Sequence, residues 1–175
     1  TLSLHDALPI SPQVIVNAAA YTAVDQAESE PEQARRVNAE AVAVLAREAR
    51  QLGSLLVHYS TDYVFAGQAT APYRETDATA PQSVYGRTKL AGEAAIIATG
   101  CPHLIFRTSW VYGAHGNNFV KTILRLAQTR DTLSVVSDQL GAPTSARLLA
   151  DTTLAVVSQL QYQRHGWLER SGIYH

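Results

Sequence analysis

Cysteine and charge are both scarce in this 175-residue chain. Cys101 is its one cysteine, which excludes an internal disulfide framework and a cysteine-rich zinc site. The six histidines show no metal-ligand spacing, so we expect no metal ion. Charged residues make up 17 %, too few for a disordered chain. No apolar run approaches the ~20 residues that a membrane helix needs.

The charges that are present nearly cancel: 14 Lys and Arg against 15 Asp and Glu give a formal net charge of −1. This balance argues against nucleic acid or a membrane as a partner, because both attract clustered positive charge. Hydrophobic residues reach 46 %, enough for a buried core, and the length suits about one domain. No signal-peptide pattern occurs, so we expect a cytoplasmic protein.

Two motifs of common enzyme classes are also missing. No Gly-x-Ser-x-Gly elbow occurs, which disfavours a serine hydrolase. No Gly-x-Gly-x-x-Gly occurs either. Gly113 and Gly116 form only a lone Gly-x-x-Gly, which carries little weight as a phosphate loop.

Apolar runs alternate with helical patterns, which indicates βαβ units and a parallel sheet. The expected fold class is α/β, a truncated Rossmann-like doubly wound parallel sheet that begins in mid-sheet at Val14. We expect strands at 13–20, 54–60 and 133–138, and a strand that runs into a loop within 103–113. The start of another strand is expected at 172–175. We expect helices at 30–52, 84–98, 117–128 and 148–160, with a surface loop at 67–81.

The helix ends carry capping signals. Ser29 is expected to cap the first helix, with Glu32 reaching back and Pro31 in the first turn. Gly53 and Gly100 are expected to end the first two helices. A 3.6-residue period predicts the buried side of the first helix: Val37, Ala41, Val44, Leu45, Ala49 and Leu52. The helix at 117–128 is capped by Asn117 or Asn118 and buries Phe119, Ile123 and Leu126 or Ala127.

Tyr85 and Lys89 stand four residues apart at the start of the helix 84–98, so they share one helical face. A nearby Lys cation lowers the pKa of a tyrosine from about 10 toward neutral pH, where the phenol is a better acid–base catalyst. The spacing also occurs by chance in many helices. A partly buried tyrosine beside a solvated lysine explains it more often than a catalytic pair does.

Other polar or small residues stand at the ends of successive strands, the edge where parallel sheets bind ligands. Ser60, Thr61 and Asp62 follow one strand, and Trp110 follows another. The alanines at 18–20 end the first strand and leave room for a flat ligand. Each feature has a plainer explanation: a capped turn, a core tryptophan, or tight packing of a strand on a helix. Because all of these features lie at the same edge of the predicted sheet, a ligand site is favoured over the separate plainer explanations.

Taken together, six segments resemble the dTDP-4-dehydrorhamnose reductase family of the extended short-chain dehydrogenase/reductases. They are VNAAAYTAVDQAE, STDYVF, VYGRTKLAGE, RTSWVYG, GNNFVKTILRLA and SDQLGAPT. The resemblance covers roughly Pro12 to Leu160 and extends to the final GIYH. It implies an enzyme that uses NADPH or NADH to reduce the 4-keto group of dTDP-4-dehydro-6-deoxy-L-mannose to dTDP-L-rhamnose.

The resemblance also implies a role for each matching residue. Tyr85 is the expected general acid at the C4 oxygen, Lys89 holds the nicotinamide ribose, and Thr61 donates a hydrogen bond to the same oxygen. The cofactor-binding residues it implies are Ala18, Ala19, Ala20, Ser60, Tyr85 and Lys89. The substrate-binding residues it implies are Thr61, Asp62, Trp110 and Asn118.

The sequence departs from complete family members in one respect. It lacks the glycine-rich strand–turn–helix that seats the pyrophosphate and the residue that selects NADH or NADPH. We therefore expect an internal fragment that binds the cofactor weakly or not at all. Residues 1–11 are expected to be a leader foreign to the family. Residues 12–175 are expected to be a partial NAD(P)-binding domain, with substrate-binding elements at about 110–175, from a full-length protein compatible with a homodimer.

Two other functions fit the same residues. An epimerase or dehydratase of the same superfamily uses the same tyrosine and lysine on another nucleotide sugar. Thr61-Asp62-Tyr63 and the segment SDQLGAPT favour the reductase over it. A non-catalytic regulatory subunit with a reductase-like fold is the second alternative, and the intact Tyr85, Lys89 and Thr61 argue against it.

Overall fold

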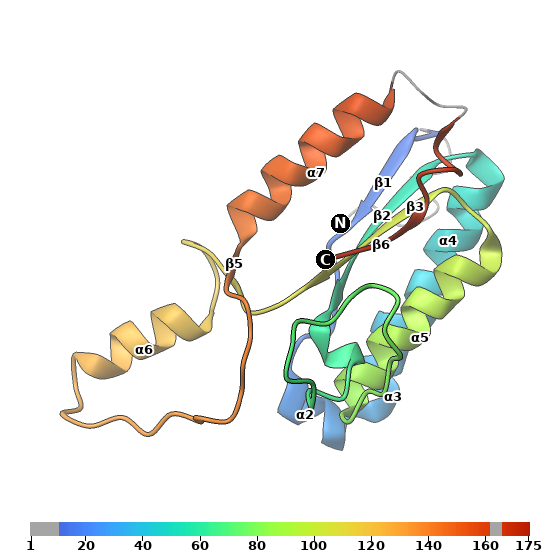
Figure 1. The fold of residues 1–175 in the computed structure, drawn as a ribbon. Helices are drawn as coiled ribbons and strands as arrows, with labels where there is room; N and C mark the ends of the chain where they lie inside the picture. Colours follow the sequence, from blue (N-terminus) through green and yellow to red (C-terminus); the bar gives the residue numbers. More distant parts are fainter. Residues whose placement is uncertain (1–10, 162–165) are drawn as a thin grey trace. The chain divides into compact units, whose positions relative to one another are not determined.

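The computed structural model describes residues 11–161 and 166–175 (Figure 1). The described residues fall into two compact units, 11–107 with 166–175, and 108–161. Of the leader expected at 1–11, all but Ser11 lies outside the described residues. Within the described part, no helix combines the length and the apolar character needed to cross a membrane.

The first unit is built on a four-stranded sheet of order β1-β2-β3-β6. Its strands are β1 (Val14–Asn17), β2 (Leu55–Thr61), β3 (His103–Thr108) and β6 (Gly172–Tyr174). β1 runs parallel to β2, with Asn17 opposite His58, and β6 runs parallel to β3. β2 is buried along nearly its whole length, as its run of apolar residues predicts. The expected parallel α/β sheet is confirmed.

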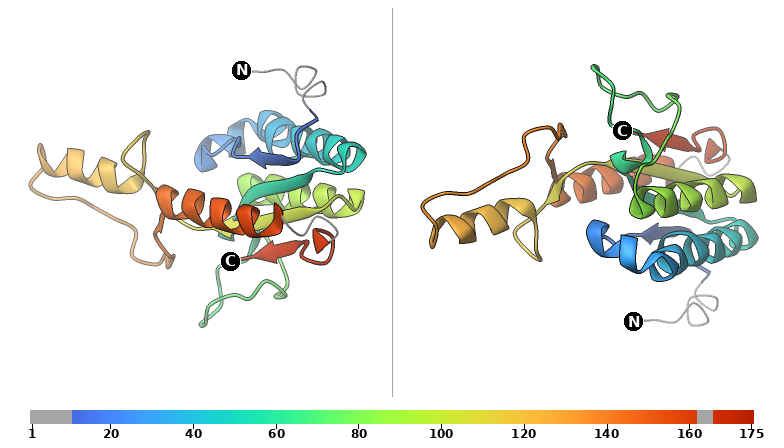
Figure 2. Two further views of the ribbon diagram at one scale, coloured as in Figure 1. Left: turned by 90° about the horizontal axis from the view of Figure 1, so that it is seen from above. Right: turned by 90° about the horizontal axis from the view of Figure 1, so that it is seen from below.

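Helices α4 (Ala41–Leu52) and α5 (Val84–Thr99) lie side by side in this unit (Figure 2). Both end in a left-handed glycine, Gly53 at φ 65° and Gly100 at φ 64°, as predicted. Burial of apolar side chains between the helices and the sheet drives this packing. The main core cluster is Val42, Ala46, Ala49, Leu56, Ile96, Cys101 and Ile105.

The first helical segment differs from the prediction. Helix α2 (Val24–Ser29) begins before Ser29, and α3 (Pro31–Arg35) follows it after a break at Glu30. The predicted capping box is wrong, because the Ser29 hydroxyl donates to the Gln26 carbonyl and Glu30 precedes α3 without a side-chain cap. Pro31 does take the first helical position, and it explains the break: a residue before proline is pushed out of the helical region.

The buried side of α4 is also shifted from the predicted one. The buried residues are Val42, Ala46 and Ala49, whereas Ala41 is exposed. A π-helical turn, η2 (Arg36–Glu40), leads into α4. A π turn holds more residues than an α turn, so a count of 3.6 residues carried through it assigns the wrong side chains to the core.

The second unit contains a short parallel pair, β4 (Val111–Tyr112) and β5 (Thr144–Ser145), with helices α6 (Phe119–Ala127) and α7 (Ala146–Gln161). Asn118 caps α6 by accepting a hydrogen bond from the Lys121 amide, as predicted. The predicted strand at 133–138 is wrong, because the structure has neither strand nor helix there and Val135 and Val136 are exposed.

The predicted buried side of α6 is wrong as well. No residue of α6 is buried among the described residues, and Phe119 is 50 % exposed. The apolar spacing identified the apolar face of the helix correctly, but spacing does not say what covers a face.

Candidate active site

Thr61 and Tyr85 meet at the carboxyl end of β2. Thr61 ends the strand, and its hydroxyl accepts a hydrogen bond from the Tyr63 amide at 3.2 Å, which starts the 3₁₀ turn η3 (Asp62–Val64). Tyr85 lies in the first turn of α5. The Thr61 hydroxyl lies close enough to the Tyr85 hydroxyl to affect the pKa of the phenol. The structure therefore brings this predicted pair together.

The start of α5 is fixed by three contacts. The Ser83 hydroxyl accepts a hydrogen bond from the Gly86 amide at 3.0 Å, and the Glu28 carboxylate accepts one from the Val84 amide at 2.7 Å. A Cβ on Gly86 would lie 2.3 Å from the Tyr63 carbonyl oxygen. Glycine at this position is therefore what allows α5 to approach η3 closely enough to place Tyr85.

Burial raises the pKa of the Tyr85 phenol above its ordinary value of 10.0. The Thr61 hydroxyl opposes this rise, while the charges of Asp62 and Tyr63 add to it. The predicted lowering of the Tyr85 pKa by Lys89 is therefore wrong, because loss of solvent around the phenolate is the dominant effect. At neutral pH Tyr85 is protonated and can donate a proton.

Lys89 is buried beneath β2, with 1 % of its surface exposed. Its Nζ donates to the Tyr59 carbonyl at 2.6 Å and lies 3.4 Å from His58 Nε2. Burial lowers the pKa of Lys89 to about 8, and the charge of Glu93 acts in the opposite direction. The plainer explanation of the spacing, a solvated lysine, does not hold.

The alanines at 18–20 follow β1 at the same sheet edge as Thr61, because β1 and β2 are parallel. Ala18 and Ala19 are exposed and Ala20 is half-buried. The Asn17 side-chain oxygen accepts a hydrogen bond from the Ala19 amide at 3.2 Å, which fixes the chain as it leaves β1. This segment presents small side chains and backbone to the edge that carries Thr61.

The sequence analysis missed Asn38, which lies buried in η2. Its side chain accepts from the Tyr21 amide at 2.8 Å and donates to the Tyr21 carbonyl and to the Thr88 hydroxyl, each at 3.1 Å. Thr88 lies on α5 between Tyr85 and Lys89. Asn38 thus joins the chain after Ala20 to the helix that carries Tyr85. A polar residue between Val37 and Ala39, inside an apolar helical stripe, was the available signal.

Ser60 is turned away from Thr61, as neighbouring residues of a strand are. Its hydroxyl donates to Glu93 Oε1 at 2.5 Å, and Glu93 forms a buried ion pair with Arg107 at 2.7 Å. The structure thus assigns Ser60 to the packing of α5 on the sheet. A cofactor-binding role for Ser60 stays a prediction without a supporting contact.

Asp62 stands beside Thr61, whose hydroxyl lies 3.2 Å from Asp62 Oδ1. The other two expected substrate residues belong to the second unit. Asn118 donates to the Gly113 carbonyl at 2.8 Å, and the Trp110 ring lies 5.5 Å from that of Phe119, the residue after Asn118. Within that unit the structure groups Trp110 and Asn118 at the start of α6.

Trp110 is held in a strained backbone conformation, with φ at 44°. Its indole packs on Gly141, where an added Cβ would lie 2.6 Å from Trp110 Nε1. Gly141 belongs to the segment SDQLGAPT, so the second unit gives this segment a structural role in placing Trp110. Non-glycine residues with positive φ are concentrated at functional sites.

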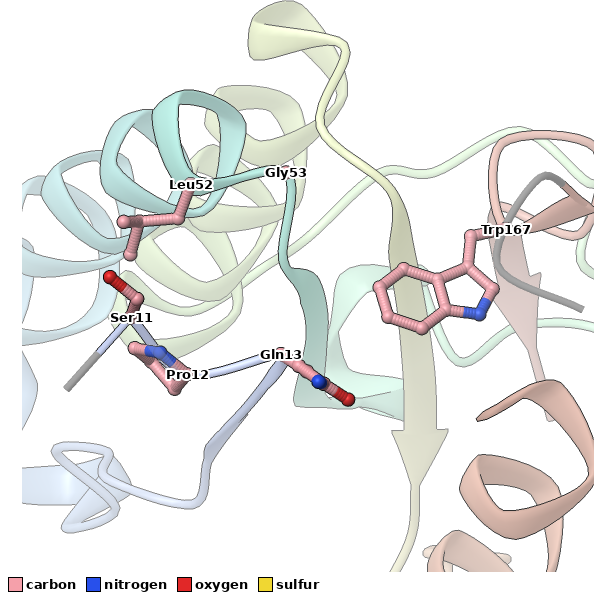
Figure 3. Close-up of a pocket in the computed structure, with 6 residues that line it drawn as sticks. All are labelled: Ser11, Pro12, Gln13, Leu52, Gly53 and Trp167. Atoms are coloured by element: carbon pink, nitrogen blue, oxygen red, sulfur yellow. The ribbon is translucent and has the colours of Figure 1, made fainter. Parts of the chain in front are cut away.

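A separate hollow of about 260 Å³ lies at the other end of β1, away from the edge with Thr61 (Figure 3). Its lining residues are Ser11, Pro12, Gln13, Leu52, Gly53 and Trp167. None of the residues expected to carry chemistry lines it. The candidate site is therefore the edge formed by Thr61, Tyr85 and the alanines at 18–20.

Comparison with known proteins identifies the family behind these features. The family model described as the RmlD substrate binding domain matches residues 3–175. The chain belongs to the RmlD family. The match begins within the segment 1–11 that was expected to be foreign, and the extent of that leader stays a prediction.

Several curated proteins are similar to this chain at high identity. The dTDP-4-dehydrorhamnose reductase of Salmonella typhimurium is 63 % identical over 145 residues, which cover 82 % of this chain and 48 % of the relative. That of Burkholderia thailandensis is 52 % identical over 164 residues, covering 94 % and 55 %. The chain thus spans about half the length of the curated relatives it matches.

Solved structures of RmlD relatives share the fold. A dTDP-4-dehydrorhamnose reductase from Clostridium acetobutylicum superposes with a TM-score of 0.85 at 42 % identity, covering 96 % of this chain and 56 % of that one. The Bacillus anthracis enzyme, solved in complex with NADP, gives 0.84 at 40 % identity, covering 98 % and 58 %. The expected Rossmann-like α/β class is confirmed.

Proposed function

We propose that this chain carries the proton-donating part of an NAD(P)H-dependent reductase that converts dTDP-4-dehydrorhamnose to dTDP-L-rhamnose. The observation that carries the proposal is the proximity of the Thr61 and Tyr85 hydroxyl groups at the carboxyl end of β2. Lys89 lies one helical turn beyond Tyr85 and is buried. Relatives at 63 % and 52 % identity bear the name of this activity.

Tyr85 donates the proton in the proposed reaction. Its raised pKa keeps the phenol protonated at neutral pH, so the O–H can be transferred to the C4 oxygen of the sugar as the ketone becomes an alcohol. The Thr61 hydroxyl donates a hydrogen bond to the same oxygen and stabilises the negative charge that develops there. A bound nicotinamide supplies the hydride.

The residues present fit one end of a dinucleotide cofactor. The small side chains of the alanines at 18–20 leave room for the nicotinamide beside Thr61, and Ala18 and Ala19 are exposed. A Lys89 ammonium has three donors, of which Tyr59 takes one, so it can also hold ribose hydroxyls. The sequence holds no Gly-x-Gly-x-x-Gly turn for the pyrophosphate. We therefore expect isothermal titration of this chain with NADPH to show weak binding, and micromolar affinity would contradict this part of the proposal.

The proposal extends to the rest of the chain. Residues 12–175 are a partial NAD(P)-binding domain, and Asp62, Trp110 and Asn118 contact the dTDP-sugar. The placement of Trp110 by Gly141 supports a shaped surface in the second unit. The enzyme works in the cytoplasm, and its full-length form is compatible with a homodimer.

A chimera tests the proposed reaction. The matching segment of the Salmonella typhimurium relative, 63 % identical, is replaced by this chain, and NADPH oxidation is followed with the dTDP-4-keto sugar. Net oxidation with formation of dTDP-L-rhamnose is expected. An epimerase regenerates its cofactor, so sugar conversion without net NADPH oxidation contradicts the proposal. A folded chimera that binds NADPH without turnover also contradicts it and favours a regulatory subunit.

A further inference from the structure

Three buried side chains connect β1 to α5. Asn17 on β1 lies 3.0 Å from His58 on β2, measured between Asn17 Nδ2 and His58 Nδ1. The other ring nitrogen, Nε2, lies 3.4 Å from Lys89 Nζ on α5. All three residues are less than 10 % exposed: Asn17 7 %, His58 0 % and Lys89 1 %. Water therefore cannot substitute for these contacts without cost.

The contacts of Asn17 determine where His58 carries its proton. Asn17 Oδ1 accepts a hydrogen bond from the Ala19 amide at 3.2 Å, so the amide oxygen must face Ala19 and the amide nitrogen must face His58. An amide nitrogen only donates, so His58 Nδ1 accepts. A neutral imidazole has one acceptor nitrogen and one N–H, which places the proton of His58 on Nε2.

This tautomer directs an N–H group at Lys89. A neutral Lys89 amine can accept that hydrogen bond with its lone pair while one of its own N–H groups donates to the Tyr59 carbonyl at 2.6 Å. A Lys89 ammonium has donors only, so it would face the Nε2–H with another N–H. A charged Lys89 can donate to His58 only if Nε2 has lost its proton and become an acceptor. The proton of neutral His58 is then on Nδ1, which can no longer accept the hydrogen bond from Asn17.

We propose that His58 is a positioning residue for Lys89: Asn17 selects the His58 tautomer, and that tautomer holds the Lys89 nitrogen against the Tyr59 carbonyl. A proton on Lys89 then competes with the Asn17–His58 hydrogen bond. Because Asn17 also holds Ala19, the protonation of Lys89 is coupled to the segment at 18–20. This inference rests on the proposed function, in which Lys89 holds the nicotinamide ribose.

The other charges around Lys89 agree with this competition. Glu93 on α5 favours the ammonium, but its carboxylate is already paired with Arg107 on β3. Burial outweighs Glu93 and lowers the pKa of Lys89 to about 8. Burial and the Lys89 charge also lower the pKa of His58 to about 3. His58 therefore stays neutral near pH 8, and only its tautomer changes.

Nitrogen NMR of this chain with ¹⁵N-labelled histidine tests the proposal, because the two ring nitrogens report the tautomer directly. Above the pKa of Lys89, about 8, we expect the His58 proton on Nε2, and below it on Nδ1. In Lys89→Met, which removes the ammonium and keeps an unbranched side chain of similar length, we expect the proton on Nε2 on both sides of pH 8. The proposal is overturned if His58 of the wild-type chain keeps the same tautomer across this pH range. It is also overturned if the tautomer of His58 still changes with pH in Lys89→Met.

Asn17→Asp provides a second variant with the opposite effect. A carboxylate accepts from Nδ1–H, so neutral His58 is expected to hold its proton on Nδ1 on both sides of pH 8 and to accept from Lys89 through Nε2. The pKa of Lys89 should rise by about one unit or more. Asn38→Asp adds the same charge at another buried asparagine, which bonds to Tyr21 and Thr88, and should leave the tautomer change in place. An unchanged Lys89 pKa in Asn17→Asp overturns the proposal. Turnover is not measured, so a negative result leaves the proposed function intact.

Discussion

Tyr85 owes its protonated state to its surroundings rather than to Lys89. Burial removes water from the phenolate and raises the pKa, and the nearby Asp62 charge acts in the same direction. The Lys89 amine is directed at the Tyr59 carbonyl. A protonated phenol suits a reductase, because reduction of a ketone consumes a proton at the new hydroxyl oxygen.

Tyr85→Phe removes the proposed proton donor and keeps the ring. In the chimera, kcat should fall by about 10²–10⁴-fold, the usual contribution of general acid catalysis, while the affinity for NADPH stays nearly the same. Steady-state kinetics and isothermal titration measure the two quantities. Tyr63→Phe is the matched control, since the Tyr63 ring lies 5.6 Å from that of Tyr85. An equal loss of kcat in both variants would remove Tyr85 from its proposed role.

Gly86→Ala tests the close approach that places Tyr85. The new Cβ would lie 2.3 Å from the Tyr63 carbonyl oxygen, and backbone cannot rotate out of the way as a side chain can. We expect a loss of about 1–3 kcal/mol in the free energy of unfolding, measured with urea. Gly166→Ala, where nothing lies within 4 Å of the added atom, should change it by much less. Similar losses in both variants would show that the contact with Tyr63 is not the cause.

At the scale of elements, local signals predicted β1, β2 and α5 well, whereas the strand predicted at 133–138 is not formed. β2 begins with the apolar run Leu55–Val57, and α5 ends just before Gly100, as that glycine indicated. The region from Val24 to Leu52 was predicted less well. Pro31 breaks the helix at Glu30, and the π turn η2 changes the helical period. A single apolar period cannot represent either feature.

Local sequence signals also predicted some residues of the candidate site and not others. Thr61 and Tyr85 could be predicted because each stands at the end of an element with a clear sequence pattern. His58 and Asn38 were harder to predict, because their importance comes from partners 31 and 50 positions away along the chain. The one sequence signal for Asn38 is its place as a polar residue inside an apolar helical stripe. Long-range polar contacts between buried side chains leave no periodic trace in a sequence.

The ion pair of Glu93 and Arg107 joins α5 to β3, and Ser60 of β2 donates to the same carboxylate. Glu93→Gln leaves the Arg107 charge buried without its partner, which should cost about 3–5 kcal/mol in the free energy of unfolding. Asp151→Asn is the control, since it breaks the exposed pair with Arg147 and should cost less than about 1 kcal/mol. Urea unfolding measures both. A small effect of Glu93→Gln would mean that the three elements are held together by apolar packing alone.

For the molecule as a whole, two buried bases make stability depend on pH at both ends of the range. His58 has a pKa of about 3 in the fold against an ordinary value of 6.5, and Lys89 about 8 against 10.5. The unfolded chain therefore binds more protons than the folded one in both windows. In each window stability rises with pH.

The free energy of unfolding should accordingly fall as the pH drops below about 6.5, by up to about 1.4 kcal/mol for each pH unit while the unfolded His58 is protonated and the folded one is not. It should also rise from about pH 8 toward pH 10.5, as the folded Lys89 loses the proton that its unfolded form keeps. Urea unfolding at a series of pH values measures both slopes. His58→Gln should flatten the acidic slope and Lys89→Met the alkaline one, because neither replacement titrates. The free energy of unfolding of His58→Gln could instead fall with decreasing pH as steeply as that of the parent chain. The carboxylates alone would then cause the loss of stability in acid, and burial of neutral His58 would not govern it.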